Sequence, residues 1–430
     1  MKPIGVDLFA GAGGLSLGFE QAGFDVLAAV EIDPVHCATH EYNFPHCTTI
    51  CQSVAEVTGR EIRERSKIGD RKIDVLFGGP PCQGFSLIGK RLLDDPRNTL
   101  VFHFIRLIHE LQPKYFVMEN VKGMAIGKHQ DFILEVIDKI QYGGYEVLLP
   151  YQVLNAAYYG VPQNRERLFL MGARRGCPLP EYPSPVTKPA NSTKKRDRKL
   201  HHLPDSPTVW DALQDLPDIE QYGELHHRDW VRATFGTPST YGEKLRNASA
   251  DSQDYSQSRQ FDRTVLSASG RTRHSPKSMA RFEATQPGDT EPISRFHKLD
   301  PQGVCNTLRA GTPSSRGAFT SPRPIHPHLP RCITVREAAR LHSYPDWFRF
   351  HTTKWHGFRQ IGNSVPPLLG RSVAGQIVKV LEATPSKPTE LLPLGNEEML
   401  SLTMAQAARY YGVASDVIPQ RRSYKHEGNG

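Results

Sequence analysis

Cys82 is the residue of this sequence with the clearest capacity for covalent chemistry. It lies in Gly79-Pro-Pro-Cys-Gln-Gly-Phe-Ser86, where two prolines fix the backbone in front of the thiol. A thiolate is a strong nucleophile once its pKa is lowered. A lone cysteine is usually a small core residue, but a polar loop rich in Gly and Pro does not favour that structural role. We therefore interpret Cys82 as a candidate nucleophile.

Glu119 is the candidate acid beside this thiol. It follows the apolar run 115–118, and Cys82 follows the apolar run 73–77. The carboxyl ends of neighbouring parallel strands meet at one edge of a sheet, which would bring the two residues together. An acid next to a thiol suits attack on a polarised heteroaromatic ring, because the acid binds a ring nitrogen while sulfur adds. The alternative is a carboxylate that caps the next helix.

Two arginines follow in Gln163-Asn-Arg-Glu-Arg167. Strand alternation predicts Arg165 and Arg167 on one side and Glu166 on the other. The arginines can bind a phosphate or a base carbonyl, or they can form a surface row of ion pairs.

A glycine-rich turn indicates a nucleotide-like cofactor. In Asp7-Leu-Phe-Ala-Gly-Ala-Gly-Gly14 a strand enters a turn that a ligand can approach closely. Glu31 ends the next strand, where a carboxylate can accept ribose hydroxyls. It could instead sit at the N-terminus of a helix that begins near Pro34. A dehydrogenase remains possible at this point. Gly362-Asn-Ser-Val-Pro-Pro367 is a second tight turn, able to close over the cofactor.

The elements that must position these residues alternate between strands and helices. Apolar patterns predict strands at 4–9, 26–30, 73–77, 115–118 and 168–171, and helices at 15–22, 99–111 and 132–140. This order predicts an α/β fold with a doubly wound, mostly parallel sheet.

The chain divides into four predicted parts. Residues 1–174 form a catalytic and cofactor-binding domain, and 175–330, rich in Pro, Ser, Arg and His, form an irregular second domain. Residues 331–382 return to the first domain through helices at 334–341 and 366–381, with Thr334 as an N-cap. Residues 383–430 form a tail with a docking helix at 399–411.

Composition limits the classes of protein. The chain has 430 residues and a net charge of +8, and residues 173–330 hold 23 Lys and Arg against 17 Asp and Glu. This excess hints at a polyanionic partner. No apolar run reaches the ~18 residues that span a membrane, and we expect a cytoplasmic protein without a signal peptide. Seven cysteines without a CxxC pair argue against a disulfide framework or a structural zinc site.

Taken together, these motifs resemble those of the cytosine-C5 DNA methyltransferases of prokaryotic type. The motifs occur in the family's order, with its long variable region between the fourth and fifth, across roughly residues 4–382. They are Asp7–Gly14, Gly79–Ser86, Glu119–Val121, Gln163–Arg167, Arg336-Glu-Ala-Ala-Arg-Leu341 and Gly362–Val365. The resemblance implies a Rossmann-like methyltransferase domain with a smaller target-recognition domain.

The resemblance also implies a mechanism. Cys82 adds to C6 of a cytosine, Glu119 contacts N3, and Arg165 and Arg167 hold the base and its adduct. The methyl group comes from S-adenosyl-L-methionine, which leaves as S-adenosyl-L-homocysteine, and no metal is needed. The base must be flipped out of the duplex, because C5 and C6 are inaccessible in the stack.

Further site residues follow from the same resemblance. Ser53 stands near the place where the family often has an Asp that binds the adenine amino group. The expected cofactor residues are Phe9, Gly11, Ala12, Gly13, Gly14, Glu31, Ile32, Ser53, Pro81, Asn363, Ser364 and Val365. The expected DNA contacts are Gln83, Ser86 and Arg97 in a closing loop, and Arg271, Arg273, Thr307, Leu308 and Arg309 in the recognition domain. Further cations that could reach phosphates or guanine edges are Arg259, Arg263, Lys277 and Arg281.

The expected partner is double-stranded DNA, and one catalytic and one recognition domain suffice for a monomer. A cognate restriction enzyme or other defence-system proteins are expected companions. One alternative is an RNA (tRNA) cytosine-C5 methyltransferase on the same fold, although the long basic insertion favours duplex DNA. Another is a catalytically dead DNA-binding module, which the intact Cys82 and Glu119 do not favour. An NAD-dependent oxidoreductase gives the Pro-Pro-Cys loop no role.

Overall fold

The computed structural model describes residues 2–81, 99–125, 130–247, 251–311 and 323–417. The catalytic part is built on one central sheet, in the order β3-β2-β1-β4-β5-β9-β6, with β7 also paired to β9. Its strands are β1 Ile4–Leu8, β2 Asp25–Glu31, β3 Thr48–Cys51, β4 Val75–Gly78, β5 Tyr115–Val121, β6 Tyr145–Val147, β7 Gln152–Asn155 and β9 Glu166–Arg174.

The sheet is parallel from β3 to β5, whereas β6, β7 and β9 form an antiparallel extension. The doubly wound, mostly parallel sheet is therefore confirmed. The chain winds outward from β1 through β2 to β3 and then returns to β4 on the other side of β1. This places a topological switch point between β1 and β4, where open α/β sheets bind their ligands at the carboxyl ends of the strands.

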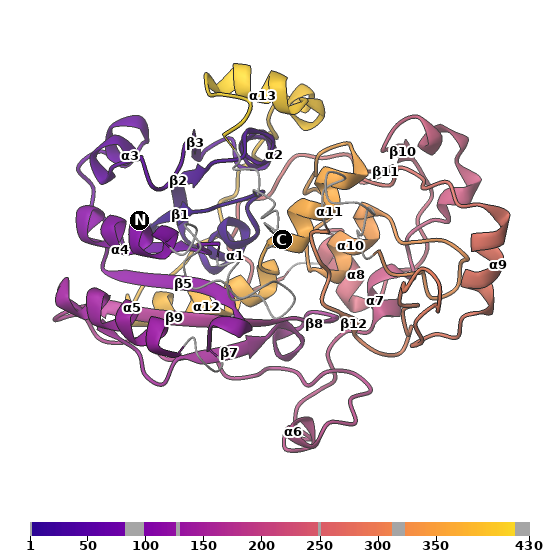
Figure 1. Ribbon diagram of the computed structural model, residues 1–430, viewed down its shortest axis with the longest axis horizontal. Coiled ribbons are helices and arrows are strands. Elements are labelled where there is room, and N and C mark those ends of the chain that lie inside the picture. Colours follow the sequence, from indigo (N-terminus) through magenta and orange to yellow (C-terminus); the bar gives the residue numbers. More distant parts are fainter. Residues whose placement is uncertain (1, 82–98, 126–129, 248–250, 312–322, 418–430) are drawn as a thin grey trace, which may run out of the picture.

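Helices cover both faces of this sheet (Figure 1). One core cluster joins Phe19 of α1 and Val373 of α12 to Phe77 and Val117 of the sheet. The other joins Phe104 of α4 to Leu76 and Phe116, together with side chains of α3 and α5. The helices of this part are α1 Gly14–Ala22, α2 Pro34–Asn43, α3 Gly59–Arg65, α4 Thr99–Leu111, α5 Gln130–Tyr142 and α12 Pro367–Val380.

Helix α12 lies against α1, as the sequence predicts for its return to the first domain. A Cβ atom on Gly18 would lie 2.7 Å from the carbonyl oxygen of Pro367. The absence of a side chain at Gly18 thus allows the two helix backbones to approach closely. The C-terminal part of the chain therefore completes the catalytic body.

The remaining residues form a second lobe of short elements joined by long irregular segments (Figure 1). The lobe packs on α10, where Thr334 is the predicted N-cap and accepts from the Glu337 amide at 3.1 Å. Its elements, with the last two from the C-terminal part, are α6 Lys195–Arg198, α7 Val209–Leu213, β10 Val231–Arg232, α8 Thr240–Leu245, β11 Val265–Leu266, α9 Pro276–Ala284, β12 Cys305–Asn306, α10 Val335–Leu341 and α11 Lys354–Asn363. Helix α13 Met404–Tyr411 belongs to the tail.

The tail docks on the catalytic part, although the predicted single helix at 399–411 is wrong. A 3-10 turn spans Glu397–Ser401, and α13 begins after Thr403, which caps it. The Tyr411 hydroxyl donates to Glu41 of α2 at 2.8 Å. No described helix is long and apolar enough to cross a membrane.

Candidate active site

The glycine-rich turn after β1 has a backbone that few side chains tolerate. Phe9, Gly11 and Gly13 have φ values of 60°, 56° and 100°. A Cβ atom on Gly13 would lie 2.3 Å from a Phe44 ring carbon, and one on Gly14 would lie 2.5 Å from the Val365 carbonyl oxygen. Glycine is therefore required at both positions, and the turn is packed against the segment 362–365, far away in sequence.

Glu31 holds this turn through hydrogen bonds to backbone amides. Its Oε2 accepts from the Gly11 amide at 2.8 Å, and its Oε1 accepts from the Asp33 amide at 2.9 Å. Helix α2 is capped by Asp33, which accepts from Val35 and His36. Glu31 is thus not the helix cap, and its carboxylate lies at the end of β2 beside the turn.

Ile32 and Ser53 lie beside Glu31 on the same edge of the sheet. Cys51 of β3 is directly opposite Glu31, and the Gln52 amide donates to the Glu31 carbonyl at 2.9 Å. Both Ile32 and Ser53 are half-buried. The neighbouring ends of β2 and β3 therefore offer an apolar side chain and a hydroxyl next to the carboxylate.

The chain that leads to Cys82 starts beside Glu119. A Cβ atom on Gly79 would lie 2.6 Å from Glu119 Oε2, and Asn120 Nδ2 donates to the Pro80 carbonyl at 3.1 Å. Pro81 is the last described residue before the gap. The predicted site residues Cys82, Gln83, Ser86 and Arg97 lie outside the described residues.

Glu119 and Arg167 form an ion pair on adjacent antiparallel strands. Arg167 Nε lies 2.9 Å from Glu119 Oε1, and both side chains are largely buried. Burial raises the pKa of Glu119, and the positive charges of Arg167 and Arg165 partly oppose this rise. Glu119 is not a helix cap, because it belongs to β5. A carboxyl with a raised pKa is suited to give a proton to a ring nitrogen.

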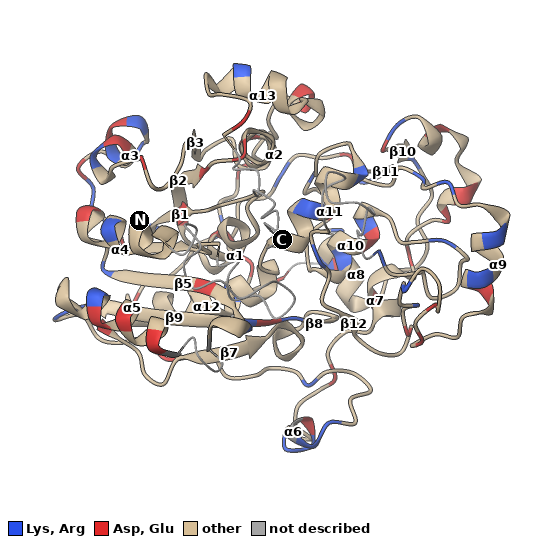
Figure 2. Ribbon diagram, in the orientation of Figure 1, with Lys and Arg blue, Asp and Glu red and all other residues tan. Residues whose placement is uncertain are grey.

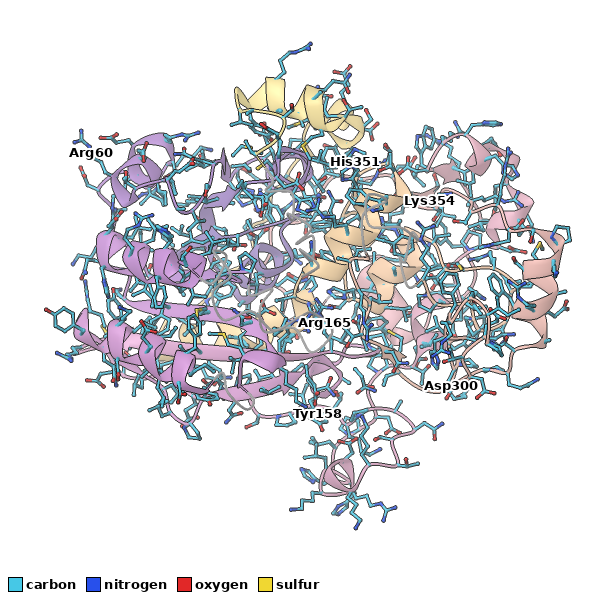
Figure 3. All side chains as sticks on the ribbon, in the orientation of Figure 1. Arg60, Tyr158, Arg165, Asp300, His351 and Lys354 are labelled. Atoms are coloured by element: carbon cyan, nitrogen blue, oxygen red, sulfur yellow. The ribbon has the colours of Figure 1, made fainter. Side chains whose placement is uncertain are left out.

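Arg165 has different surroundings from Arg167. Its side chain is fully buried and precedes β9, so the two arginines do not form one strand face. Nη1 donates to the Leu308 carbonyl at 2.9 Å, and Nη2 donates to the carbonyls of Gly362 at 2.8 Å and Ser364 at 2.7 Å. Arg165 therefore connects Leu308 of the second lobe to the turn at 362–364, which we call the cofactor-side turn. It lies at the junction, the place where the two lobes meet (Figure 3).

Gln163 makes a second connection at this junction, and sequence reasoning assigned it no role. Its Oε1 accepts from the Leu308 amide at 3.1 Å, while Nε2 donates to the Leu341 carbonyl at 3.1 Å. Strand β12 runs parallel to β8 (Gln163–Asn164), and the Thr307 hydroxyl donates to the Asn164 carbonyl at 2.6 Å. The available signal was its position in the same motif as Arg165.

The remaining cofactor-side residues come from the end of α11. Asn363 is exposed, Ser364 is half-buried, and Val365 is buried. The Ser364 carbonyl accepts from Arg165, and its hydroxyl donates to the Ile361 carbonyl at 2.9 Å. A Cβ atom on Gly14 would lie 2.8 Å from Ser364 Cβ and 2.7 Å from the Tyr344 hydroxyl, so both side chains border the turn.

The predicted DNA contacts differ in their exposure. Arg273 and Arg309 are exposed, as is Arg263, whereas the Leu308 side chain is buried. Arg271 forms an ion pair with Glu220 in the second lobe. Among the described arginines of the expected DNA contacts, Arg273 and Arg309 are thus exposed, and Arg263 is exposed among the further cations.

Arg259 was expected to reach DNA, and this prediction is wrong. Its side chain is fully buried and its guanidinium forms two hydrogen bonds of 2.8 Å with Glu20 of α1. The guanidinium also lies 4.8 Å from the centre of the Trp347 ring. Arg281, another of the expected cations, lies 3.2 Å from Glu291.

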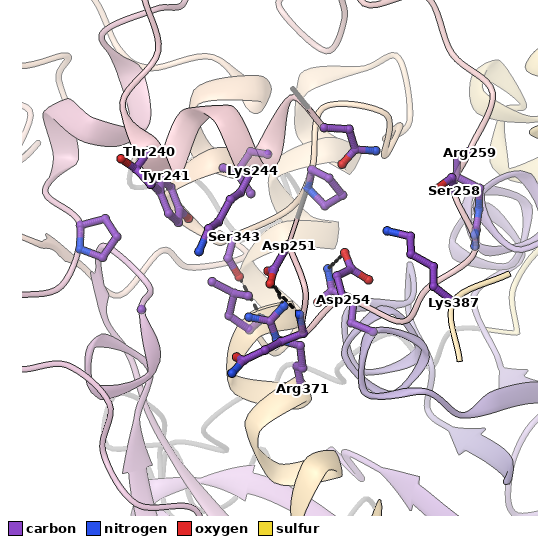
Figure 4. A pocket seen from close by; sticks show the side chains of 18 of the residues that line it. Thr240, Tyr241, Lys244, Asp251, Asp254, Ser258, Arg259, Ser343, Arg371 and Lys387 are labelled. Carbon is purple, nitrogen blue, oxygen red and sulfur yellow. Dashed lines mark hydrogen bonds and ion pairs between the residues drawn. The ribbon is translucent and has the colours of Figure 1, made fainter. Parts of the chain in front are cut away.

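A hollow of about 770 Å³ lies away from the predicted catalytic and cofactor residues, between α8, α12 and the segment 251–263 (Figure 4). Asp251 and Arg371 form an ion pair of 2.7 Å on its wall. Its lining contains none of the predicted catalytic or cofactor residues. The candidate active site is thus the edge of the sheet between β1, β4 and β5.

Comparisons with known proteins agree with this geometry. Residues 5–379 match the model of the family described as C-5 cytosine-specific DNA methylase. The chain is 60% identical to the Type II methyltransferase M.XorII of Xanthomonas oryzae pv. oryzae, over 98% of this chain and 95% of that protein. It is 33% identical to the Type II methyltransferase M.AgeI of Thalassovita gelatinovora, over 86% of this chain and 98% of that protein.

Solved structures are similar as well. A candidate DNA modification methyltransferase encoded within an E. coli prophage has a TM-score of 0.71 and 35% identity, covering 89% of this chain and 100% of that one. The S. pombe Dnmt2 methyltransferase has a TM-score of 0.51 at 15% identity over 89% of this chain and 100% of that one, a similarity of fold.

Proposed function

The chain belongs to the C-5 cytosine-specific DNA methylase family and is an S-adenosylmethionine-dependent DNA (cytosine-5-)-methyltransferase, and from this premise we propose that Cys82 is its nucleophile and Glu119 its acid. One observation carries the assignment. The Glu119 carboxylate, held by Arg167, lies beside Gly79, where a Cβ atom would be 2.6 Å from Oε2, and Gly79 leads into the Cys82 segment.

In the proposed reaction the Cys82 sulfur forms a bond to C6 of cytosine. Glu119 binds N3 and supplies a proton there, which lets electron density develop at C5 as sulfur adds. S-adenosyl-L-methionine supplies the methyl group that C5 acquires. Loss of the C5 proton to solvent, return of the N3 proton to Glu119 and departure of the sulfur as a thiolate then restore the ring and the enzyme. No step uses a metal ion.

The two arginines take different roles in this proposal. Arg167, beside Glu119, holds the carboxyl in place and faces the target base. Arg165 is a positioning residue, because within the described part of the chain its guanidinium donates to the main-chain carbonyls of Leu308, Gly362 and Ser364. This division replaces the expectation that both arginines bind the base.

The described residues fit S-adenosylmethionine at the β1–β2 edge. The Gly11 Cβ position is open, with no atom of the described residues within 4 Å, so a ligand can approach the turn there. Glu31 offers a carboxylate to ribose hydroxyls, while Ile32 and Ser53 flank the place of an adenine ring. The full proposed set is Phe9, Gly11, Ala12, Gly13, Gly14, Glu31, Ile32, Ser53, Pro81, Asn363, Ser364 and Val365.

The substrate is double-stranded DNA, with the target cytosine flipped from the stack. We assign recognition to residues 175–330, catalysis to 1–174 and 331–382, and a docking tail to 383–430. Arg273 and Arg309 are the proposed exposed contacts, with Arg271, Thr307 and Leu308 supporting them. The Type II relatives support a modification enzyme of a restriction-modification system. We further propose that it acts as a cytoplasmic monomer beside a cognate restriction enzyme.

The test is methylation of unmethylated genomic DNA by the purified enzyme with S-adenosylmethionine, followed by mapping of 5-methylcytosine at base resolution. We expect methylation at one short motif, its loss in Cys82→Ala, and full activity in the control Cys177→Ala, a free, half-buried cysteine. Calorimetry should show that Cys82→Ala still binds the cofactor. Persistent methylation by Cys82→Ala would exclude the nucleophile, and methylation of tRNA alone would exclude the DNA substrate.

A further inference from the structure

A basic finger projects from the molecule below the junction of β8 and β12 (Figure 1). It comprises residues 188–205 and includes α6. Its two ends are joined at the base, where the Lys188 amide donates to the Pro204 carbonyl at 2.9 Å and the Ser206 amide donates to the Lys188 carbonyl at 2.7 Å. Lys188 and Asp205 also form an ion pair there. The finger is therefore a closed loop with a defined base.

Most of the charged residues of the finger are Lys or Arg (Figure 2). Residues 188–199 contain six basic residues and one acid, Asp197. Asp197 is buried, where it accepts from the Tyr158 hydroxyl at 2.6 Å and from the Ser192 hydroxyl. Four cations are exposed and form no ion pair with a carboxylate of the described part of the chain: Lys194, Lys195, Arg198 and Lys199. The acid thus anchors the finger while these cations face solvent.

The anchor connects the finger to the turn that leads into Gln163 and Arg165. Tyr158 belongs to the 3-10 turn Ala156–Tyr159, a few residues before β8. Its carbonyl accepts from the amides of Val186 at 2.9 Å and Thr187 at 3.1 Å. Figure 3 shows Tyr158 at the base of the finger. A duplex held between the two lobes would pass this end of the junction.

We propose that the 188–205 finger, which projects from the segment assigned to recognition, binds the phosphate backbone of the DNA that flanks the target site. The proposal rests on the duplex DNA substrate of the enzyme. Exposed Lys and Arg side chains without nearby acids suit phosphates, whose neutralisation releases counterions and is independent of base sequence. The finger thus contributes affinity and not the choice of target.

The test compares the variant K194Q/K195Q/R198Q/K199Q with the parent. A matched control, R60Q/R65Q/K67Q/K72Q, removes four exposed cations on and after α3, at the far side of the molecule (Figure 3). Dissociation constants are measured at several salt concentrations for a duplex that extends about two helical turns (~20 base pairs) beyond the methylated motif on each side. A second duplex contains the motif with minimal flanks.

On the long duplex we expect the finger variant to bind about tenfold more weakly, with a slope of log K against log salt shallower by about 3. On the short duplex it should bind like the parent, as should the control variant on both. Equal salt slopes for the parent and the finger variant would overturn the proposal. This is the result expected if the finger binds an acidic protein and not DNA. Equal losses on both duplexes would also overturn it.

The proposed catalytic assignments are tested separately from the finger. Single-turnover methylation at saturating DNA should give the same motif and rate for the finger variant and the parent. If the parent methylates no DNA, the proposed function fails, whereas the binding comparison still decides the role of the finger. Unchanged melting temperatures of both variants, expected for exposed side chains, confirm that each is folded.

Discussion

Arg167 Nε lies 2.9 Å from Glu119 Oε1, and this pair crosses the antiparallel junction between β5 and β9. Arg167 is directly opposite Val121, so Glu119, two residues earlier on β5, is its diagonal neighbour on the same face. Burial raises the pKa of Glu119 while Arg167 limits that rise. The pair thus keeps a proton-donating carboxyl in a fixed position beside the Cys82 segment.

The first prediction concerns Glu119→Gln. An amide cannot supply a proton to N3, so the single-turnover methylation rate should fall by about 10² to 10⁴-fold, while cofactor affinity measured by calorimetry stays within twofold, about the accuracy of the method. The control is Glu166→Gln on the neighbouring strand β9, where the carboxylate pairs with the half-exposed Lys122. A rate for Glu119→Gln close to that of Glu166→Gln would contradict the acid role.

The second prediction concerns Arg165→Gln, which leaves the carbonyls of Leu308, Gly362 and Ser364 without their donor. We expect a loss of about 3 to 5 kcal/mol in the free energy of unfolding, because buried acceptors lose charged partners. Cofactor affinity should fall as well, since Gly362 and Ser364 belong to the cofactor-side turn.

Denaturant titration and calorimetry measure these two effects. Arg165→Lys should recover part of the stability, since its ammonium can still donate to a carbonyl, and the exposed Arg309→Gln is the control. If Arg165→Gln were stable and lost only DNA affinity, Arg165 would be a base contact instead.

The third prediction is a pH dependence of stability that originates from Asp7. Burial raises the pKa of Asp7 from 3.8 to about 8, although its hydrogen bond from Ser16 acts in the opposite direction. The folded protein therefore holds a proton that the unfolded chain releases above about pH 4. The stabilisation is fully present below that pH and is lost as pH rises towards about 8.

Between these pH values the parent should lose about 1.4 kcal/mol per pH unit relative to Asp7→Asn, which has no proton to release. Urea unfolding at pH 5, 6, 7 and 8 gives this difference, and Asp70→Asn, an exposed carboxylate, is the control. Parallel pH profiles for the parent and Asp7→Asn would show that Asp7 is ionised in the folded protein.

The fourth prediction separates a structural arginine from a DNA-binding one. Arg259→Met leaves Glu20 buried without its partner, so unfolding should become easier by about 3 to 5 kcal/mol while the salt slope of DNA binding is unchanged. Arg273→Gln, at an exposed position, should leave the free energy of unfolding unchanged and reduce the salt slope of DNA binding by about 1. A reduced slope in a fully folded Arg259→Met would restore Arg259 as a phosphate contact.

Local patterns made much of this architecture predictable. Apolar runs of strand length that end in Gly, Glu or Pro identified β1, β2, β4 and β5, and helical periodicity identified α1, α4 and α12. The short strands β3, β6 and β7 were not recognised, because polar residues interrupt their three or four positions, whereas the equally short β4 is apolar up to its closing glycine. The helix at 399–411 was predicted too long, because Thr403 starts a new helix there.

By itself the sequence determined the order of the motifs, the α/β class and the identity of the reactive groups, because these depend on residue type and on neighbours a few positions away. The tertiary structure alone decided which charged groups face each other. Arg165 meets Leu308 across 143 residues, and Arg259 meets Glu20 across 239. An arginine that binds phosphate and one that closes a buried ion pair have the same local sequence signal, and burial together with the long-range partner distinguishes them.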